Sequence, residues 1–196
     1  MQKQTKSLVS RIFLCSGIGL LVVTAVALLL WNWGVHSSQK KAASYVSTIR
    51  ALIPEPQGAA LEERSNNTMS ALSIDGTNFV GIVEMPKYDS SLPVCGDWGK
   101  VTKYPCHFSG SIYDRSMQIG ATTQAGQYDF YREISVGDSL LYTDMEGNRF
   151  SYTVSDIRYK NHADQTALQQ ENAALTLFIK NIYAFEYIII FCDISE

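Results

Sequence analysis

The sequence predicts a mainly β domain carried on a single membrane-spanning helix. An uncharged apolar stretch near the N-terminus, Ile12–Trp31, is long enough to cross a hydrocarbon core of about 30 Å as a helix. From Asn78 onward the sequence changes to short apolar runs, rich in β-branched and aromatic residues and separated by turn signals. The 196 residues are 46% hydrophobic, which indicates an ordered domain and not a disordered chain.

The N-terminal apolar stretch is interpreted as an uncleaved signal anchor. Trp31 and Trp33 stand where an aromatic belt at a membrane surface is expected. A cleavable signal peptide is the rival interpretation, but its apolar core is normally shorter, and no small-x-small cleavage site directly follows this stretch. Lys3, Lys6 and Arg11 precede the stretch without an acidic residue, which favours a cytoplasmic N-terminus and an extracytoplasmic domain.

The predicted organisation has four parts. They are a short cytoplasmic tail at 1–11, a transmembrane anchor at 12–33, a helical spacer and linker at 34–76, and one core domain at 77–196. Apolar residues recur at three- and four-residue spacing in Val35–Leu52, which predicts an amphipathic helix ended by Pro54. Gln57–Gly76 is polar and weakly periodic, as in a linker. The remaining length, about 120 residues, suffices for one core and not for two domains.

Short runs joined by turns predict the strands of the core domain. These runs are Phe79–Met85, Leu92–Val94, Phe108–Ile112, Met117–Ala121, Ser139–Thr143, Phe150–Ile157, Ala174–Ile179 and Tyr187–Cys192. Asp144–Asn148 predicts a hairpin turn, because Gly147 can adopt a positive φ. Gln165–Ala173 is the best helix candidate in this part of the chain.

Composition excludes several classes of function. The net charge is −3, with no basic stripe and no interleaving of aromatic and basic residues, so nucleic acid is not an expected partner. The four cysteines contain no close C-x-x-C pair, so no zinc or other metal site is predicted, and no cofactor is expected.

Five segments follow one another in a recognisable order and spacing over roughly residues 78–193. They are F-S-G-S-I-Y (Phe108–Tyr113), M-Q-I-G-A-T-T (Met117–Thr123), T-D-M-E-G-N (Thr143–Asn148), L-T-L-F-I-K-N (Leu175–Asn181) and Y-I-I-I-F-C (Tyr187–Cys192). Together they resemble the sortases, the membrane-anchored cysteine transpeptidases of Gram-positive bacteria. The resemblance implies a sortase-like closed β-barrel with short helices, preceded by the transmembrane helix and a helical spacer.

The resemblance also implies three catalytic groups, and this sequence lacks all three. In a sortase a Cys attacks the sorting-signal carbonyl, a His protonates the leaving amine and an Arg stabilises the oxyanion. Aligned without gaps, these positions fall on Lys180, Thr122 and Tyr187. An amine forms no thioester, a threonine has no proton to exchange near pH 7, and a phenol carries no positive charge. Because the three roles act as a unit, sortase chemistry is not expected.

Lys180 admits two interpretations. A Thr122–Lys180 pair would echo Ser–Lys dyads, in which a desolvated lysine serves as general base. The preferred interpretation is that Lys180 extends out of the former cleft, or pairs with Glu186 or Asp114, because a geometry built for Cys and His need not suit swapped roles. The three histidines, His36, His107 and His162, are interpreted as exposed or loop residues.

Three functions therefore stay open. The first is a pseudo-sortase at the cell surface that binds a sorting-signal-like peptide, a pilin or an active sortase, with Thr123, Ile179 and Asn181 as candidates for lining a retained peptide groove. The second is an acyl transferase with chemistry rebuilt around Thr122 and Lys180. The third is a purely structural surface module whose former cleft is filled.

Cys95 and Cys106 flank a loop-like segment, G-D-W-G-K-V-T-K-Y-P. An extracytoplasmic location permits a disulfide between them that would close a short loop. The free-thiol alternative stays open, because disulfide geometry cannot be read from sequence. Cys192 is expected to be a small buried residue of the last strand.

Overall fold

The computed structural model describes residues 2–55, 57–58, 68–123, 127–161, 173–184 and 186–195, with side chains described in these ranges except at 2–13 and 57–58. The chain divides into two units, Met1–Ser37 and Ser38–Glu196. His162 and all but the last residue of the helix expected at Gln165–Ala173 lie outside the described residues.

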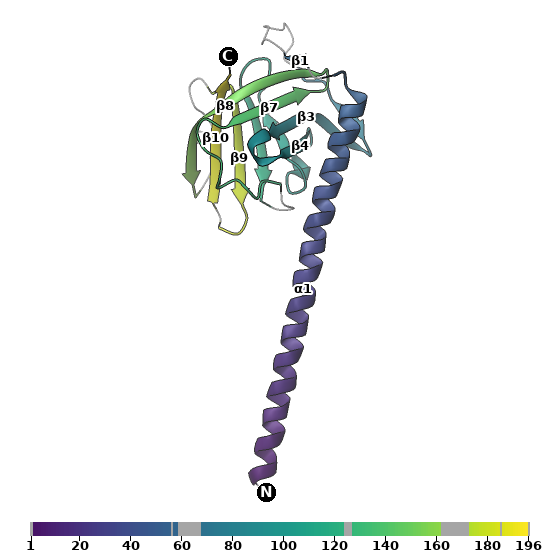
Figure 1. The fold of residues 1–196 in the computed structure, drawn as a ribbon, viewed down its shortest axis with the longest axis vertical. Coiled ribbons are helices and arrows are strands. Elements are labelled where there is room, and N and C mark those ends of the chain that lie inside the picture. The colour runs from purple at the N-terminus through teal and green to yellow at the C-terminus, as the bar shows by residue number, and fades with distance from the viewer. Residues whose placement is uncertain are drawn as a thin grey trace. The chain divides into compact units, whose positions relative to one another are not determined.

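One long helix, α1 (Gln2–Leu52), contains both the expected anchor and the expected spacer helix (Figure 1). Its apolar side chains in the first unit are largely exposed, with Leu21 at 69% and Trp33 at 74%. A helix that is apolar on all sides needs an apolar environment around it. Among the described residues, α1 is the one helix long and apolar enough to cross a membrane.

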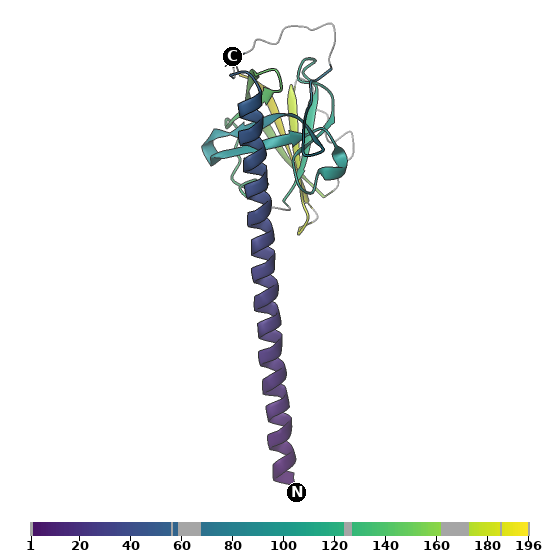
Figure 2. The same cartoon turned by 90° about the vertical axis from the view of Figure 1, so that its right-hand side faces the viewer.

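The last turns of α1, which lie in the second unit, pack against the β domain (Figure 2). Ala42, Val46 and Ile49 are buried, at the spacing that predicts an amphipathic helix. Val46 and Ile49 share an apolar cluster with Phe79, and the ring of Tyr45 lies 5.0 Å from the ring of Phe79. The spacer helix is therefore docked on the domain by its apolar stripe.

The second unit is mainly β, as predicted, and its bounds are as follows. The strands are β1 (Gln57–Gly58), β2 (Leu72–Ile74), β3 (Thr77–Met85), β4 (Ser90–Cys95), β5 (Cys106–Ser109), β6 (Met117–Thr122), β7 (Ser139–Asp144), β8 (Asn148–Lys160), β9 (Leu175–Asn181) and β10 (Glu186–Ile194), with 3₁₀ turns η1 (Pro86–Tyr88) and η2 (Trp98–Lys100). Within the described residues, eight strands close into a barrel in the order β8, β10, β9, β6, β5, β4, β3, β7 and back to β8. β2 adds to the edge of β3, so the end of the expected linker belongs to the sheet.

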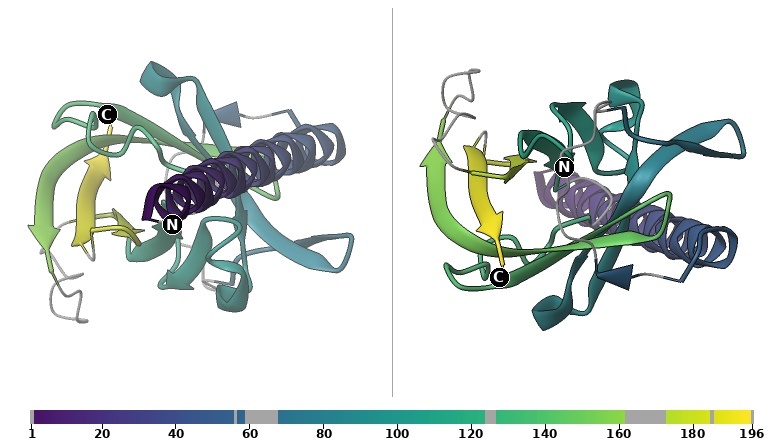
Figure 3. Two further views of the ribbon diagram at one scale, coloured as in Figure 1. Left: turned by 90° about the horizontal axis from the view of Figure 1, so that it is seen from below. Right: turned by 90° about the horizontal axis from the view of Figure 1, so that it is seen from above.

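β8 closes the barrel because it is long and serves two neighbours. Its first part pairs with β7 and its second part with β10, and it curves from one to the other (Figure 3). Side chains that alternate inward along the strands form one interior cluster. From β6, β9 and β10 this cluster takes Met117, Ile119, Ala121, Leu175, Leu177, Ile179, Ile188, Ile190 and Cys192.

Two local predictions differ in outcome. The turn between β7 and β8 forms as predicted, with Gly147 at φ 83 and Asp144 accepting hydrogen bonds from the amides of Glu146 and Asn148. β5 begins and ends earlier than the predicted Phe108–Ile112. The strand stops because Gly110 adopts φ 72, a conformation that breaks the ladder and that other residues rarely adopt.

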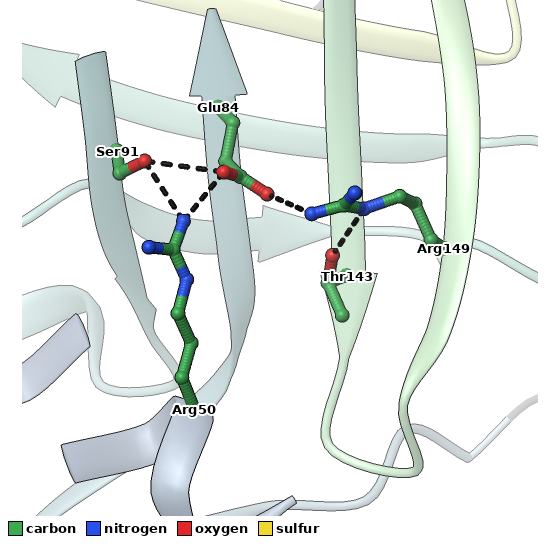
Figure 4. Close-up of polar contacts among 5 residues, drawn as sticks. All are labelled: Arg50, Glu84, Ser91, Thr143 and Arg149. Atoms are coloured by element: carbon green, nitrogen blue, oxygen red, sulfur yellow. Dashed lines mark hydrogen bonds and ion pairs between the residues drawn. The ribbon is translucent and has the colours of Figure 1, made fainter. Parts of the chain in front are cut away.

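A cluster of charged side chains joins α1 to the barrel, as Figure 4 shows. Glu84 on β3 accepts hydrogen bonds from Arg50 at 2.5 Å and from Arg149 at 2.8 Å. Ser91 adds a third bond to Glu84, and Thr143 accepts one from Arg149. The Glu84 side chain is 13% exposed, so this carboxylate depends on its partners for its polar contacts.

Candidate functional site

The three positions aligned with the sortase catalytic groups lie side by side on neighbouring strands. Thr122 on β6 is the register partner of Lys180 on β9, and Lys180 is the register partner of Tyr187 on β10. Directly opposed residues of paired strands point to the same face of a sheet. The row continues onto β8, where Lys160 is the register partner of Tyr187. We call these four residues, Thr122, Lys180, Tyr187 and Lys160, the outer row.

The outer row lies on the outside of the barrel wall. Ile179, the neighbour of Lys180, points inward and is fully buried in the interior cluster. Lys180 is exposed, and its Nζ lies 5.7 Å from the centre of the Tyr187 ring. A cation at this distance from an aromatic face is attracted by about 0.5–1 kcal/mol at an exposed site. Thr122 is buried, with an exposed fraction of 5%.

Thr123 and Asn181 hold the backbone around the outer row, Thr123 through its main-chain amide and Asn181 through its side chain. The amide of Thr123 donates to the carbonyl of Lys180 at 3.0 Å, which extends the β6–β9 pairing by one residue. Asn181 is buried and its Oδ1 accepts hydrogen bonds from the amides of Tyr183 and Ala184, while its Nδ2 donates to Tyr131 at 2.6 Å. Thr123 and Asn181 therefore order the ends of β6 and β9, and Ile179 lies in the core.

The carboxylates expected as partners of Lys180 are engaged elsewhere. Glu186 forms an ion pair with Arg132 at 3.5 Å. Asp114 accepts hydrogen bonds from the amides of Ser111 and Ser116 within its own turn. The contact described for the Lys180 ammonium is the Tyr187 ring.

The sequence did not indicate two cations on this face, Lys160 in the outer row and Arg158 next to it. Lys160 is exposed beside Tyr187, and Arg158 is the register partner of Ile189, one row below. The Arg158 guanidinium lies 4.8 Å from the centre of the Phe191 ring and its Nε donates to Asp156 at 2.8 Å. The alternating pattern R-Y-K at the end of β8 indicates that the two cations share one face of that strand. The pattern does not indicate that β10 is the neighbouring strand.

An aromatic patch lies next to the outer row on the same outer face. Its members are Trp98, Phe108 and Phe178, with ring centres 4.9, 5.9 and 5.3 Å apart. Gly120 permits this packing, because a Cβ there would meet Trp98 at 2.4 Å and Phe178 at 2.7 Å. Trp98 is 41% exposed and Phe108 38% exposed. The outer face thus combines exposed aromatic surface with the cations of Lys180, Arg158 and Lys160.

The Cys192 thiol and the His107 imidazole do not belong to the outer row. Cys192 is fully buried in the interior cluster, and burial raises the pKa of its thiol. The Nε2 of His107 forms a hydrogen bond with the carbonyl oxygen of Gly110 at 2.8 Å. Among the residues that the structure describes, no group of three His, Cys, Asp or Glu side chains is arranged to hold a metal ion.

The comparisons with known proteins identify the fold. No protein-family model and no curated protein sequence matches the chain. Solved structures do match. The sortase C1 of Streptococcus agalactiae in complex with MTSET is similar at a TM-score of 0.52 and 14% identity, over 84% of this chain and 92% of that one.

Two further structures agree. Sortase C-1 of Actinomyces oris matches at a TM-score of 0.51 and 15% identity, over 83% of this chain and 99% of that one. A sortase D5 transpeptidase of Clostridium perfringens matches at 0.50 and 11% identity, over 60% of this chain and 79% of that one. The chain therefore has a sortase-like fold, which confirms the fold implied by the sequence resemblance.

Proposed function

We propose that this protein is a membrane-anchored, extracytoplasmic pseudo-sortase that holds a peptide on the outer face of its barrel without cleaving it. In this proposal residues 1–11 are a cytoplasmic tail, 12–33 the anchor, 34–76 the spacer and linker, and 77–196 the peptide-binding barrel. The peptide is a sorting-signal-like segment, presented free, by a pilin or by an active sortase.

The observation that carries the proposal is the identity of the outer row. Thr122, Lys180 and Tyr187 are register partners on three adjacent strands, so the three aligned positions lie side by side on one face. A hydroxyl, an amine and a phenol occupy positions where transpeptidation needs an imidazole, a thiolate and a guanidinium. An acyl group transferred to an amine gives an amide, which does not turn over.

The binding half of the proposal is supported by the exposed surface next to the row. Trp98 and Phe108 offer aromatic area to an apolar side chain, as binding surfaces commonly do. Lys180, Lys160 and Arg158 favour a peptide that carries a carboxylate near that side chain. The extracytoplasmic placement is supported by the basic residues that precede the apolar part of α1.

Fluorescence anisotropy with labelled sorting-signal peptides tests binding by the full chain in detergent micelles. We expect saturable binding that Trp98→Ala weakens roughly tenfold and Lys180→Ala a few-fold. Lys41→Ala, which removes an exposed lysine of α1, is the matched control and should leave the affinity unchanged. Absence of saturable binding at high peptide concentration would favour a purely structural module.

An acyl-transfer reaction by Thr122 and Lys180 is a second candidate, because their lateral pairing on β6 and β9 brings hydroxyl and amine to the same row. The exposure of Lys180 weighs against it, since lysines that act as bases are desolvated. Rates of hydrolysis of an acyl-ester substrate test whether Thr122 and Lys180 carry out this reaction. Equal rates for the parent chain, Thr122→Ala and Lys180→Ala would eliminate this reaction.

A further inference from the structure

The seam between β4 and β5 is the thinnest join in the described barrel wall. The ladder between these strands consists of one register pair, Cys95 and Cys106. One more backbone bond flanks it, from the amide of Cys95 to the carbonyl of Pro105 at 2.8 Å. The other joins in the wall have several register pairs each; β6 and β9, for example, are paired from Met117 to Thr122.

The two cysteines lie directly opposite each other at this seam, at a strand spacing that a disulfide can bridge. Paired strands lie about 4.8 Å apart, inside the Cα separation of about 4.4–6.8 Å at which cysteines can be bridged. Both side chains are fully buried and belong to the same apolar cluster. Their sulfurs converge on the carbonyl of Asp97, at 3.7 Å for Cys95 and 3.2 Å for Cys106. Both are free thiols in this structure.

We propose that Cys95 and Cys106 are a redox pair whose disulfide closes the barrel covalently at the β4–β5 seam. The inference goes beyond peptide binding and holds whether or not the outer row binds a ligand. The extracytoplasmic placement proposed above would expose the pair to an oxidising environment, in which disulfides persist.

The surroundings of the pair make Cys95 the attacking thiol. A hydrogen bond from the Cys106 thiol lowers the pKa of Cys95 to about 7, against burial, which raises it. The amide of Asp97 also donates to the Cys95 sulfur at 3.4 Å. The same pairing and burial raise the pKa of Cys106. A thiolate at Cys95 and a protonated resolving thiol beside it match the order of thiol–disulfide exchange.

The oxidation balances with a low-molecular-weight disulfide as the oxidant. The Cys95 thiolate attacks one sulfur of oxidised glutathione, forms a mixed disulfide and releases one glutathione thiolate. Cys106 then loses its proton, attacks the Cys95 sulfur and expels the second glutathione thiolate. Two protein thiols are oxidised by two electrons, and one glutathione disulfide is reduced to two thiols. Because both sulfurs are buried, the reaction belongs to folding or to local opening of the loop between them.

Closing this loop has a consequence for the aromatic patch. The segment between the cysteines carries η2, in which Asp97 caps the turn by accepting the amide of Gly99 at 2.9 Å. η2 places Trp98 on Gly120 and Phe178, beside the outer row. A bond from Cys95 to Cys106 would fix both ends of the segment that presents Trp98.

Peptide mass mapping of the full chain in detergent tests the pair directly. The protein is refolded from urea with oxidised and reduced glutathione, free thiols are blocked with N-ethylmaleimide, and the chain is digested with trypsin. We expect the peptides Tyr88–Lys100 and Tyr104–Arg115 to be joined, and separated by dithiothreitol. Recovery of both cysteines as maleimide adducts, or of Cys95 joined to a different cysteine, would overturn the proposal.

Melting temperature and amide hydrogen exchange can be compared between the oxidised and reduced forms of the unmodified sequence. A loop of roughly 12 residues closed by a disulfide should raise the melting temperature by roughly 5–10 °C relative to the reduced protein. Amide exchange in residues 96–105 should slow on oxidation. Cys15→Ser is the matched control and should keep both effects, whereas Cys106→Ser should lose both. Equal melting temperatures of the oxidised and reduced chains would contradict closure of the seam.

Discussion

Replacing Glu84 by Gln tests whether the charged cluster shown in Figure 4 secures α1 to the barrel. Glutamine keeps one oxygen that can accept from a guanidinium, but its amide nitrogen faces the other guanidinium as a donor. A hydrogen bond to a charged group is worth about 1.5–3 kcal/mol when buried. The Arg50 and Arg149 side chains are 45% and 35% exposed, so water compensates for part of the loss. We expect Glu84→Gln to lower the free energy of unfolding by about 1–2 kcal/mol.

Urea denaturation of the full chain in micelles, followed by near-ultraviolet circular dichroism, measures this change. Double-mutant cycles with Arg50→Met and Arg149→Met should give a coupling energy of about 0.5–1 kcal/mol for each arginine with Glu84. Glu133→Gln, at an exposed glutamate, is the control and should stay within about 0.5 kcal/mol of the parent. A Glu84→Gln variant as stable as that control would refute the view that this carboxylate needs its partners.

Three further outcomes follow from other contacts. Burial alone would raise the pKa of Asp138, but hydrogen bonds from Lys87, Tyr88 and the amide of Ser135 outweigh it and lower that pKa from its ordinary value of 3.8. The ionised Asp138 therefore stabilises the fold above about pH 4, and this stabilisation is lost as the pH falls further. Asp138→Asn should lower the free energy of unfolding by about 1–2 kcal/mol at pH 7. This difference from the parent should shrink in denaturation curves measured at lower pH. Gly147→Ala should cost about 1–2 kcal/mol in urea denaturation, because φ is 83 and the new Cβ would meet the Pro54 carbonyl oxygen at 2.9 Å. Lys180→Cys alone should yield no thioester in intact-mass spectra with a sorting-signal peptide, since Thr122 and Tyr187 remain; a thioester there would show that the other two groups are dispensable.

Sequence patterns predicted most of the barrel because its strands have strong local signals. The predicted apolar runs Ala174–Ile179 and Tyr187–Cys192 correspond to β9 and β10, and Gly147 adopts the positive φ expected at its turn position. β5 was misplaced because the pattern F-S-G-S-I continues past Gly110, and only the backbone conformation of that glycine shows where the strand ends. β2 was not predicted, since a three-residue strand depends on its neighbour β3 and not on its own composition.

The residues of the candidate site were also only partly indicated by the sequence. The alignment gave Thr122, Lys180 and Tyr187, because each lies in a segment with family-like spacing. Arg158 and Lys160 could not be found from sequence, since their position beside β10 depends on the curvature and register of β8. Trp98 was equally hidden, because it reaches the outer face only through the η2 turn and the space left by Gly120.

Intact-mass spectrometry of the full chain with a sorting-signal peptide and an amine acceptor tests the central claim most directly. An active sortase with the same peptide serves as the positive control. We predict that the chain keeps its own mass and leaves the peptide whole while the control consumes it. An acyl adduct on the chain, or a peptide cleaved and joined to the acceptor, would contradict the proposal that the outer row is chemically inert.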